Sequence, residues 1–260
     1  MMKIELNGLR AVVCGGSSGI GKACSKLLAN NGASITIISR SKNKLNNIVS
    51  NLDRSKDQSH KFICADLNEP NRLDEILKDK LDYKVDILIN NSGGPKGGLL
   101  IDAEPSEFTL AFNRLLVSSQ ILTKFVVSDM QKQGFGRIIN IISTSINQVI
   151  PGLGVSNTVR GAVSQWSKTL AIELGSYNIT VNNILPGYTK TKRLEELATS
   201  KAQELNTTKD NIYKLWADST SLKRLAEPNE IANTVLFLCS GGSSYITGHN
   251  LSVDGGRYKT

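Results

Sequence analysis

A glycine-rich turn near the N-terminus constrains the fold of this chain more than any other sequence feature. Residues 15–21 read Gly-Gly-Ser-Ser-Gly-Ile-Gly, between the apolar run 9–13 and a helical pattern over 21–30. Glycine tolerates the conformations of a tight turn, and without a Cβ it lets a phosphate approach the N–H groups at a helix N-terminus. The pattern therefore predicts a strand, a phosphate-binding turn and a helix. The residues predicted to bind the phosphates are Gly15, Ser17, Ser18, Gly19, Ile20 and Gly21.

Strand and helix patterns alternate along the rest of the chain. Gly32 stands where a helix C-terminal cap is expected, and the apolar run 34–39 predicts a second buried strand. The other predicted strands are 61–64, 86–90, 137–142, 179–185 and 251–253, and the other predicted helices lie near 71–81, 105–133 and 157–175. Strands joined by crossover helices are parallel. We therefore expect one α/β domain over residues 1–260, a doubly wound parallel sheet (Rossmann fold) of about seven strands with helices on both faces.

Residues 190–222 interrupt this alternation. They are polar and helical in pattern, contain no strand signal, and follow the predicted strand 179–185. In open α/β sheets, ligands bind beyond the carboxyl ends of the strands. The segment is therefore either a lid over a substrate site or a pair of plain surface helices. Arg193, Lys201 and Trp216 within it are possible substrate contacts, although they do not name a substrate.

Composition argues against several other kinds of protein. No apolar run approaches the ~18–20 residues that span a bilayer, and the first five residues lack a signal-type apolar block, so we expect a cytoplasmic protein without a membrane partner. The formal net charge is +8, but the 31 lysines and arginines are spread along the chain, which argues against nucleic acid. The positive charge can instead attract anionic ligands. The four cysteines fall in apolar or helical stretches without C-x-x-C spacing, which predicts reduced core thiols and no metal site.

The glycine spacing G-x-x-x-G-x-G resembles that of the short-chain dehydrogenase/reductase family, and further motifs of that family follow in order. Residues 90–93, Asn-Asn-Ser-Gly, resemble its Asn-Asn-Ala-Gly signature. Residues 186–191 resemble its Pro-Gly loop, and residues 246–248 and 253–256 resemble its C-terminal signature. The resemblance runs from about residue 6 to residue 256 and is greatest to the 3-oxoacyl-acyl-carrier-protein reductases.

This resemblance implies a fold, a cofactor and an assembly. It implies a nicotinamide dinucleotide, with Asp66 and Leu67 at the adenine and Thr191 at the nicotinamide amide. Asn91 and Gly93 of the signature after the fourth strand are also implied to bind the cofactor. The resemblance further implies a homotetramer built largely on the two long helices predicted near 105–133 and 157–175.

The end of the second predicted strand bears on the choice between NADP and NAD. An acidic residue there binds the ribose 2′-hydroxyl of NAD and repels a 2′-phosphate. This chain has Ser39 and then Arg40, and a guanidinium can pair bidentately with a phosphate. We therefore predict NADP, the alternatives being NAD or an Arg40 that is merely an exposed loop charge.

The family's catalytic pattern is only partly present. Ser143 stands at the end of the fifth predicted strand, as the family's catalytic serine does, and Asn113 matches its helix asparagine. The family's Tyr-x-x-x-Lys pair would fall about thirteen residues after the serine, where this chain has Ser156 and Arg160. A serine hydroxyl is a weaker acid than a phenol and is too short to take its place. Arg160 keeps a positive charge that can hold the nicotinamide ribose, but a guanidinium is a poor proton shuttle.

Tyr188 is a further catalytic candidate, because its loop borders the predicted nicotinamide site. The alternative for this residue is a packing or lid contact. The leading hypothesis is an NADP-dependent oxidoreductase acting on a carbonyl or alcohol, in which Ser143 orients the carbonyl and Arg160 or Tyr188 gives electrostatic help. The second hypothesis is a non-catalytic NADP-binding sensor or assembly subunit, suggested by the changes at Ser156 and Arg160. Acyl-carrier-protein thioesters are a possible substrate by resemblance alone.

Overall fold

The computed structural model describes residues 4–258, and within that range seven parallel strands form one sheet in the order β3-β2-β1-β4-β5-β6-β7. The strands are β1 (Arg10–Cys14), β2 (Ser34–Ser39), β3 (Lys61–Cys64), β4 (Ile87–Asn90), β5 (Gly136–Ile141), β6 (Ile179–Pro186) and β7 (Asn250–Val253). Every pairing between neighbouring strands is parallel. The chain moves outward from β1 to β3 and then crosses to β4 on the other side of β1. This switch point is where a doubly wound sheet leaves a crevice for a ligand.

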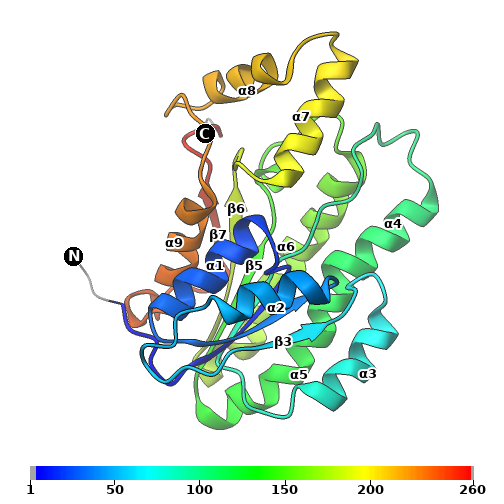
Figure 1. Ribbon diagram of the computed structural model, residues 1–260. Helices are drawn as coiled ribbons and strands as arrows, with labels where there is room; N and C mark the ends of the chain where they lie inside the picture. The colour runs from blue at the N-terminus through cyan, green and yellow to red at the C-terminus, as the bar shows by residue number, and fades with distance from the viewer. Residues whose placement is uncertain (1–3, 259–260) are drawn as a thin grey trace.

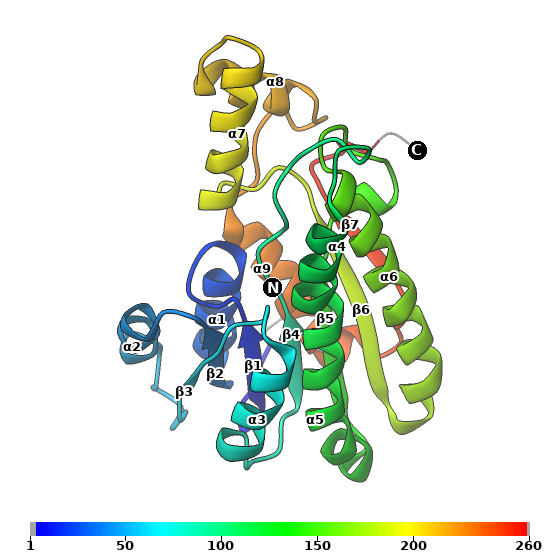
Figure 2. The ribbon, with the colours of Figure 1, turned by 90° about the vertical axis from the view of Figure 1, so that its right-hand side faces the viewer.

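Helices cover both faces of the sheet, which explains why the central strands are apolar on both sides. One face carries α1 (Gly19–Asn30), α2 (Lys42–Ser50) and α9 (Pro228–Cys239), and the other carries α3 (Pro70–Lys80), α4 (Pro105–Phe112), α5 (Ser118–Gln133) and α6 (Gly154–Leu174) (Figures 1 and 2). Buried apolar side chains form a cluster on each side of the sheet. Because helices flank it on both faces, β4 reads as a fully buried run, Ile-Leu-Ile-Asn.

Two further helices stand beyond the carboxyl edge of the sheet. They are α7 (Lys192–Glu204) and α8 (Lys209–Asp218), drawn in yellow and orange above the strand ends in Figures 1 and 2. They pack on each other through a small apolar cluster that contains Ala198, Ala202 and Ile212. The helical character predicted for 190–222 is thereby confirmed.

The strands agree with the sequence predictions to within about two residues, but the helices do not agree everywhere. The helices α2 and α9 are absent from the predictions. The predicted helix 105–133 contains a π-helical turn over Asn113–Val117, in which the Ser118 N–H donates to the Asn113 carbonyl. Such turns insert one residue into the helix and re-aim the side chains around them.

The segment Pro105–Gln133 is also long and apolar enough to pass a composition test for a membrane span. Its apolar side chains have another explanation in this fold. Leu122, Val126 and Met130 pack against the sheet, and the indole of Trp166 on α6 donates a 2.7 Å hydrogen bond to Gln120. The segment therefore has the packing of a core helix of an α/β sheet.

The prediction for the cysteines was wrong at one position. Cys14, Cys24 and Cys239 are buried, and burial raises the pKa of the Cys14 and Cys24 thiols to about 12. Cys64 is exposed, because it ends the edge strand β3 with its side chain outside the core, where its thiol donates to the Arg40 carbonyl.

Candidate active site

A cleft of about 1130 Å³ opens at the carboxyl ends of the strands, between the turn after β1 and the helices α7 and α8. The sequence-predicted site residues that line it are Gly15, Ser17, Ser18, Gly19, Ile20, Arg40, Asp66, Leu67, Asn91, Gly93, Ser143, Ser156, Arg160, Tyr188 and Thr191. Gly21 lies directly beneath the turn rather than on the cleft wall. Asn113 is not among the lining residues, since it begins the π-helical turn behind the wall.

The turn after β1 is built around the absence of Cβ atoms. Gly15 and Gly19 have φ angles of 60° and 50°, in the left-handed region. A Cβ at Gly21 would lie 2.4 Å from the Gly15 carbonyl oxygen, and a Cβ at Gly15 would lie 2.7 Å from the side-chain nitrogen of Asn91. The α1 cap residue, Ser18, makes no side-chain capping bond. The first N–H groups of α1 therefore face the cleft without a side-chain acceptor, the arrangement that binds phosphate.

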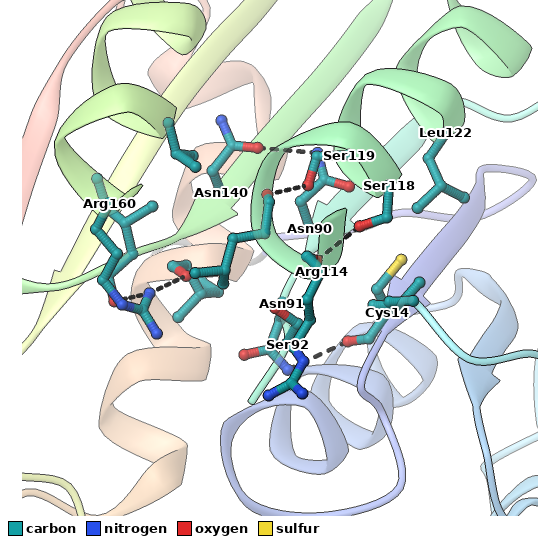
Figure 3. Close-up of a pocket in the computed structure, with 15 residues that line it drawn as sticks. Cys14, Asn90, Asn91, Ser92, Arg114, Ser118, Ser119, Leu122, Asn140 and Arg160 are labelled. Atoms are coloured by element: carbon teal, nitrogen blue, oxygen red, sulfur yellow. Dashed lines mark hydrogen bonds between the residues drawn. The ribbon is translucent and has the colours of Figure 1, made fainter. Parts of the chain in front are cut away.

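Asn91 fixes this turn against the end of β4. Its amide nitrogen donates to the Cys14 carbonyl at 3.2 Å and approaches the Gly15 carbonyl at 3.5 Å. Figure 3 shows this side chain reaching across to Cys14. The asparagine in the family-like signature thus has a structural task at the base of the phosphate turn.

A row of asparagines joins the strands below the cleft. Asn90, Asn140, Asn183 and Asn250 are neighbours in register on β4, β5, β6 and β7. Each amide nitrogen of the first three donates to the next residue's oxygen, at 2.9, 3.0 and 2.7 Å. Figure 3 shows the first of these contacts. The Asn90 side-chain oxygen has no partner among the described residues, but the amide-to-amide hydrogen bonds of the row fix the relative positions of the strand ends that carry the site.

The ends of β2 and β3 form the other half of the cleft. The Ser39 hydroxyl donates to Ser17 at 2.8 Å, which ties β2 to the phosphate turn. The Arg40 side chain is 72% exposed, and its guanidinium lies 3.8 Å from the Asp66 carboxylate. At that separation the pair is loose and well hydrated. Arg40 is thus available to a ligand.

Ser143 stands just beyond β5 with its hydroxyl proton free. It caps the short 3-10 turn Thr144–Ile146, and its oxygen accepts a 3.1 Å hydrogen bond from the Ser145 N–H. Because the oxygen accepts from the backbone, its own O–H can donate to a ligand in the cleft.

Ser156 and Arg160 lie one helical turn apart on α6 and contact each other. The Arg160 Nε donates to the Ser156 hydroxyl at 3.2 Å, and its Nη1 donates to the Ile142 carbonyl at 2.7 Å, next to Ser143. Burial, and then the charge of Arg193, lower the pKa of Arg160 to about 10. The guanidinium is therefore still charged at neutral pH.

Tyr188 is held between two partners. Its ring stacks on Trp216 of α8, with centroids 4.8 Å apart, and the Arg257 guanidinium lies 4.3 Å from the Tyr188 ring centroid. Burial raises the pKa of its phenol, and Arg257 opposes that shift. Tyr188 thus connects the loop after β6 with α8 and with the C-terminal segment.

Two arginines of the cleft were missed by sequence reasoning, Arg114 and Arg257. Arg114 directly follows Asn113 in an otherwise apolar helix, and Arg257 directly follows the C-terminal glycines. A charged residue inside an apolar helix, or directly after a glycine pair, is the sequence signal that could have identified these two arginines. Within residues 4–258, no group of three or more His, Cys, Asp or Glu side chains has the arrangement of a metal site.

The chain is similar to known proteins over nearly its whole length. A family model described as Enoyl-(Acyl carrier protein) reductase matches residues 15–257. The chain is 33% identical over 248 residues to 3-oxoacyl-(acyl-carrier-protein) reductase of Chlamydia trachomatis serovar D, covering 95% of this chain and 96% of that protein. It is 32% identical over 249 residues to dehydrogenase/reductase SDR family member 4 of Oryctolagus cuniculus, covering 95% and 92%. The solved L-sorbose reductase of Gluconobacter frateurii, complexed with NADPH and L-sorbose, matches with a TM-score of 0.92 and 29% identity over 100% of both chains.

Proposed function

Because this chain belongs to the short-chain dehydrogenase/reductase family of oxidoreductases, we propose that it is an NADPH-dependent reductase that converts a carbonyl group into an alcohol. The observation that carries the proposal is that the phosphate turn, Arg40 and the free Ser143 hydroxyl line one cleft. The match to an L-sorbose reductase complexed with NADPH supports it.

The residues of the cleft fit a dinucleotide phosphate. The turn can take this shape because Gly15 and Gly21 lack a Cβ, which would meet other atoms of the protein, and the N–H groups of α1 supply donors for a phosphate. Arg40 would bind the 2′-phosphate that distinguishes NADP from NAD. Asp66 and Leu67 would hold the adenine. The likeness to the family adds roles for Asn91, Gly93 and Thr191 along the rest of the cofactor.

The proposed chemistry uses the end of β5. Bound NADPH supplies a hydride, and the carbonyl oxygen must gain a proton. Ser143 would donate a hydrogen bond to that oxygen, while the charged Arg160 behind it would stabilise the negative charge that develops there. We propose that the Tyr188 hydroxyl, whose ring lines the cleft, gives this proton to the carbonyl oxygen and regains one from water.

We also propose that α7 and α8 are a lid. The support is the Tyr188–Trp216 stack, which joins α8 to the loop that carries Thr191.

We further propose that the protein is cytoplasmic and forms a homotetramer. Exposed apolar side chains, Leu110 on α4 and Ile172 on α6, support the assembly. Light scattering of the purified protein tests the assembly.

The experiment that tests the function is NADPH oxidation against a panel of ketones and aldehydes, with Ser143→Ala as the variant. We expect Ser143→Ala to lose turnover and to keep its NADPH affinity. Ser145→Ala is the matched control, because its hydroxyl is buried and unpartnered among the described residues while its N–H still supports Ser143. Tyr188→Phe decides whether the phenol takes part.

A different result would favour another function. Tight NADPH binding with no turnover of any substrate would indicate a non-catalytic cofactor-binding protein. The changes at Ser156 and Arg160 would then explain the lack of turnover. The relatives described above lend no support to that alternative. Equal turnover by Ser143→Ala and the wild type would remove Ser143 from the mechanism.

A further inference from the structure

Three stretches of chain send an arginine to the same backbone segment, residues 93–95. Arg114 Nη1 donates to the carbonyls of Gly93 and Gly94 at 3.4 and 3.3 Å, and Arg193 Nη2 donates to the Pro95 carbonyl at 2.5 Å. Arg160 approaches the same segment from α6. Positive charge is thus gathered beside the cleft.

Two donor atoms of this cluster lie near Gly94 and make no hydrogen bond to the protein. Arg160 Nη2 and Arg193 Nε donate to no described residue. They lie 3.4 and 3.9 Å from the point that a Cβ of residue 94 would occupy. Because residue 94 is glycine, no side chain comes between the two guanidinium groups, and Gly94, Arg160 and Arg193 all line the cleft.

Acidic residues balance this charge only in part, since Asp66 offsets part of the charge on Arg114. Arg160 is buried and pairs with no carboxylate among residues 4–258, and the nearest acid to Arg193 is Glu196, at 3.8 Å and largely exposed. Burial is the first cause that lowers the pKa of Arg114, Arg160 and Arg193, and neighbouring arginines add to the shift of Arg114 and Arg160. Like charges brought together away from water are costly unless an anion joins them.

The proposed cofactor uses at most one of these two arginines, since Arg160 can hold the nicotinamide ribose whereas Arg193 has no proposed cofactor contact. Its phosphates have their own partners in the glycine turn and Arg40. Arg160 also bonds to the carbonyls of Ile141 and Ile142, directly before Ser143. The two guanidinium groups beside Gly94 are therefore next to the proposed reaction centre.

Resting on the reductase function proposed above, we infer that the substrate carries an oxoanion, a carboxylate or a phosphate, which Arg193 and Arg160 bind beside Gly94. Guanidinium groups bind both oxoanions through short charge-assisted hydrogen bonds. The chain would therefore reduce an oxo acid or an oxo phosphate in preference to a neutral ketone of the same shape.

The test compares acids with their neutral esters. Benzoylformate, acetoacetate and laevulinate, each against its methyl ester, vary the distance between the carbonyl and the carboxylate, and dihydroxyacetone phosphate against dihydroxyacetone tests phosphate. We expect at least one anion to exceed its neutral partner in kcat/KM by about tenfold or more. Arg193→Gln should abolish that preference. Gly94→Ala should reduce it, because the added methyl group would lie against both guanidinium groups. Arg72→Gln, an exposed arginine on α3, is the matched control.

A second readout does not depend on turnover. Binding of oxalate and of inorganic phosphate to the NADP⁺-saturated protein can be followed by tryptophan fluorescence in a Trp166→Phe variant, which leaves Trp216, a residue that lines the cleft, as the single tryptophan. If no carbonyl is reduced but oxalate or phosphate binds in an Arg193-dependent manner, the reductase function fails and the oxoanion site stands. Equal use of acids and esters, or a loss of NADPH affinity as the main effect of Arg193→Gln, would overturn the inference.

Discussion

A single missing Cβ decides whether the turn after β1 can hold a phosphate. Gly21 packs under Gly15 so closely that a methyl group would reach within 2.4 Å of the Gly15 carbonyl oxygen and 2.7 Å of the Asn91 side-chain nitrogen. We predict that Gly21→Ala weakens NADPH binding strongly and lowers the free energy of unfolding by about 1–3 kcal/mol. NADPH fluorescence titration and thermal melts measure the two effects. Gly241→Ala is the control, since a Cβ there meets nothing within 4 Å.

Arg40 is the residue that would distinguish the two nicotinamide cofactors. Its guanidinium is exposed and only loosely paired with Asp66, so its removal leaves no buried charge behind. We predict that Arg40→Ala raises the Kd for NADPH by about tenfold while the Kd for NADH changes little. Arg72→Ala, which removes an exposed arginine on α3, controls for the loss of a surface charge. An equal effect on both cofactors would contradict the proposed 2′-phosphate contact.

At the scale of elements, the stack of Tyr188 on Trp216 joins α8 to the loop after β6. Stacked aromatic pairs contribute about 0.5–1.5 kcal/mol, so Trp216→Ala should raise the KM for substrate by about two- to tenfold. We expect a smaller effect on the Kd for NADPH, because the proposed phosphate contacts are made by the glycine turn and Arg40 and not by Trp216. Leu215→Ala removes an exposed side chain from the same helix and serves as the control. An unchanged KM would show that α8 is a plain surface helix.

The start of α9 gives a pH-dependent prediction. Arg224 donates two hydrogen bonds to Glu230, at 2.7 and 2.6 Å, and these, with the Glu227 N–H, lower the pKa of Glu230 from 4.5 to about 2. A carboxyl whose pKa is lowered by folding stabilises the fold above pH 4.5 and loses that effect as the pH falls toward 2. Glu230→Gln should therefore lower the Tm at pH 7, by the equivalent of about 1 kcal/mol or less.

The same variant should differ less from the wild type in acid. We expect the Tm gap between wild type and Glu230→Gln to narrow as the pH is lowered from 6 to 3. Glu173→Gln, on the exposed surface of α6, should show no such dependence. A gap that stays constant over this range would mean that the Arg224–Glu230 pair does not contribute to stability.

Across the whole molecule, sequence periodicity predicted the sheet well and the site only in part. The strands were found because burial on both faces makes them continuous apolar runs, and the glycine turn because its chemistry is local. The helix α2 was missed because its buried residues, Leu45, Ile48 and Val49, are few among polar ones. The cluster at Gly94 could not be predicted at all. Arg114 and Arg193 come from segments far apart in sequence, and only the folded chain brings them together.

The last prediction concerns the chain as one cooperative unit. The cleft joins the ends of β1, β2, β3 and β5 to α7, so a bound dinucleotide would hold both halves of the sheet and the proposed lid together. At an NADPH concentration 100 times its Kd, binding adds about 2.7 kcal/mol to the free energy of unfolding. For a domain of this size that corresponds to a Tm increase of about 5–10 °C. Calorimetry should show one transition that moves as a whole with NADPH, and a smaller shift with NADH at the same concentration. Two transitions, of which only one responds to NADPH, would contradict a single domain.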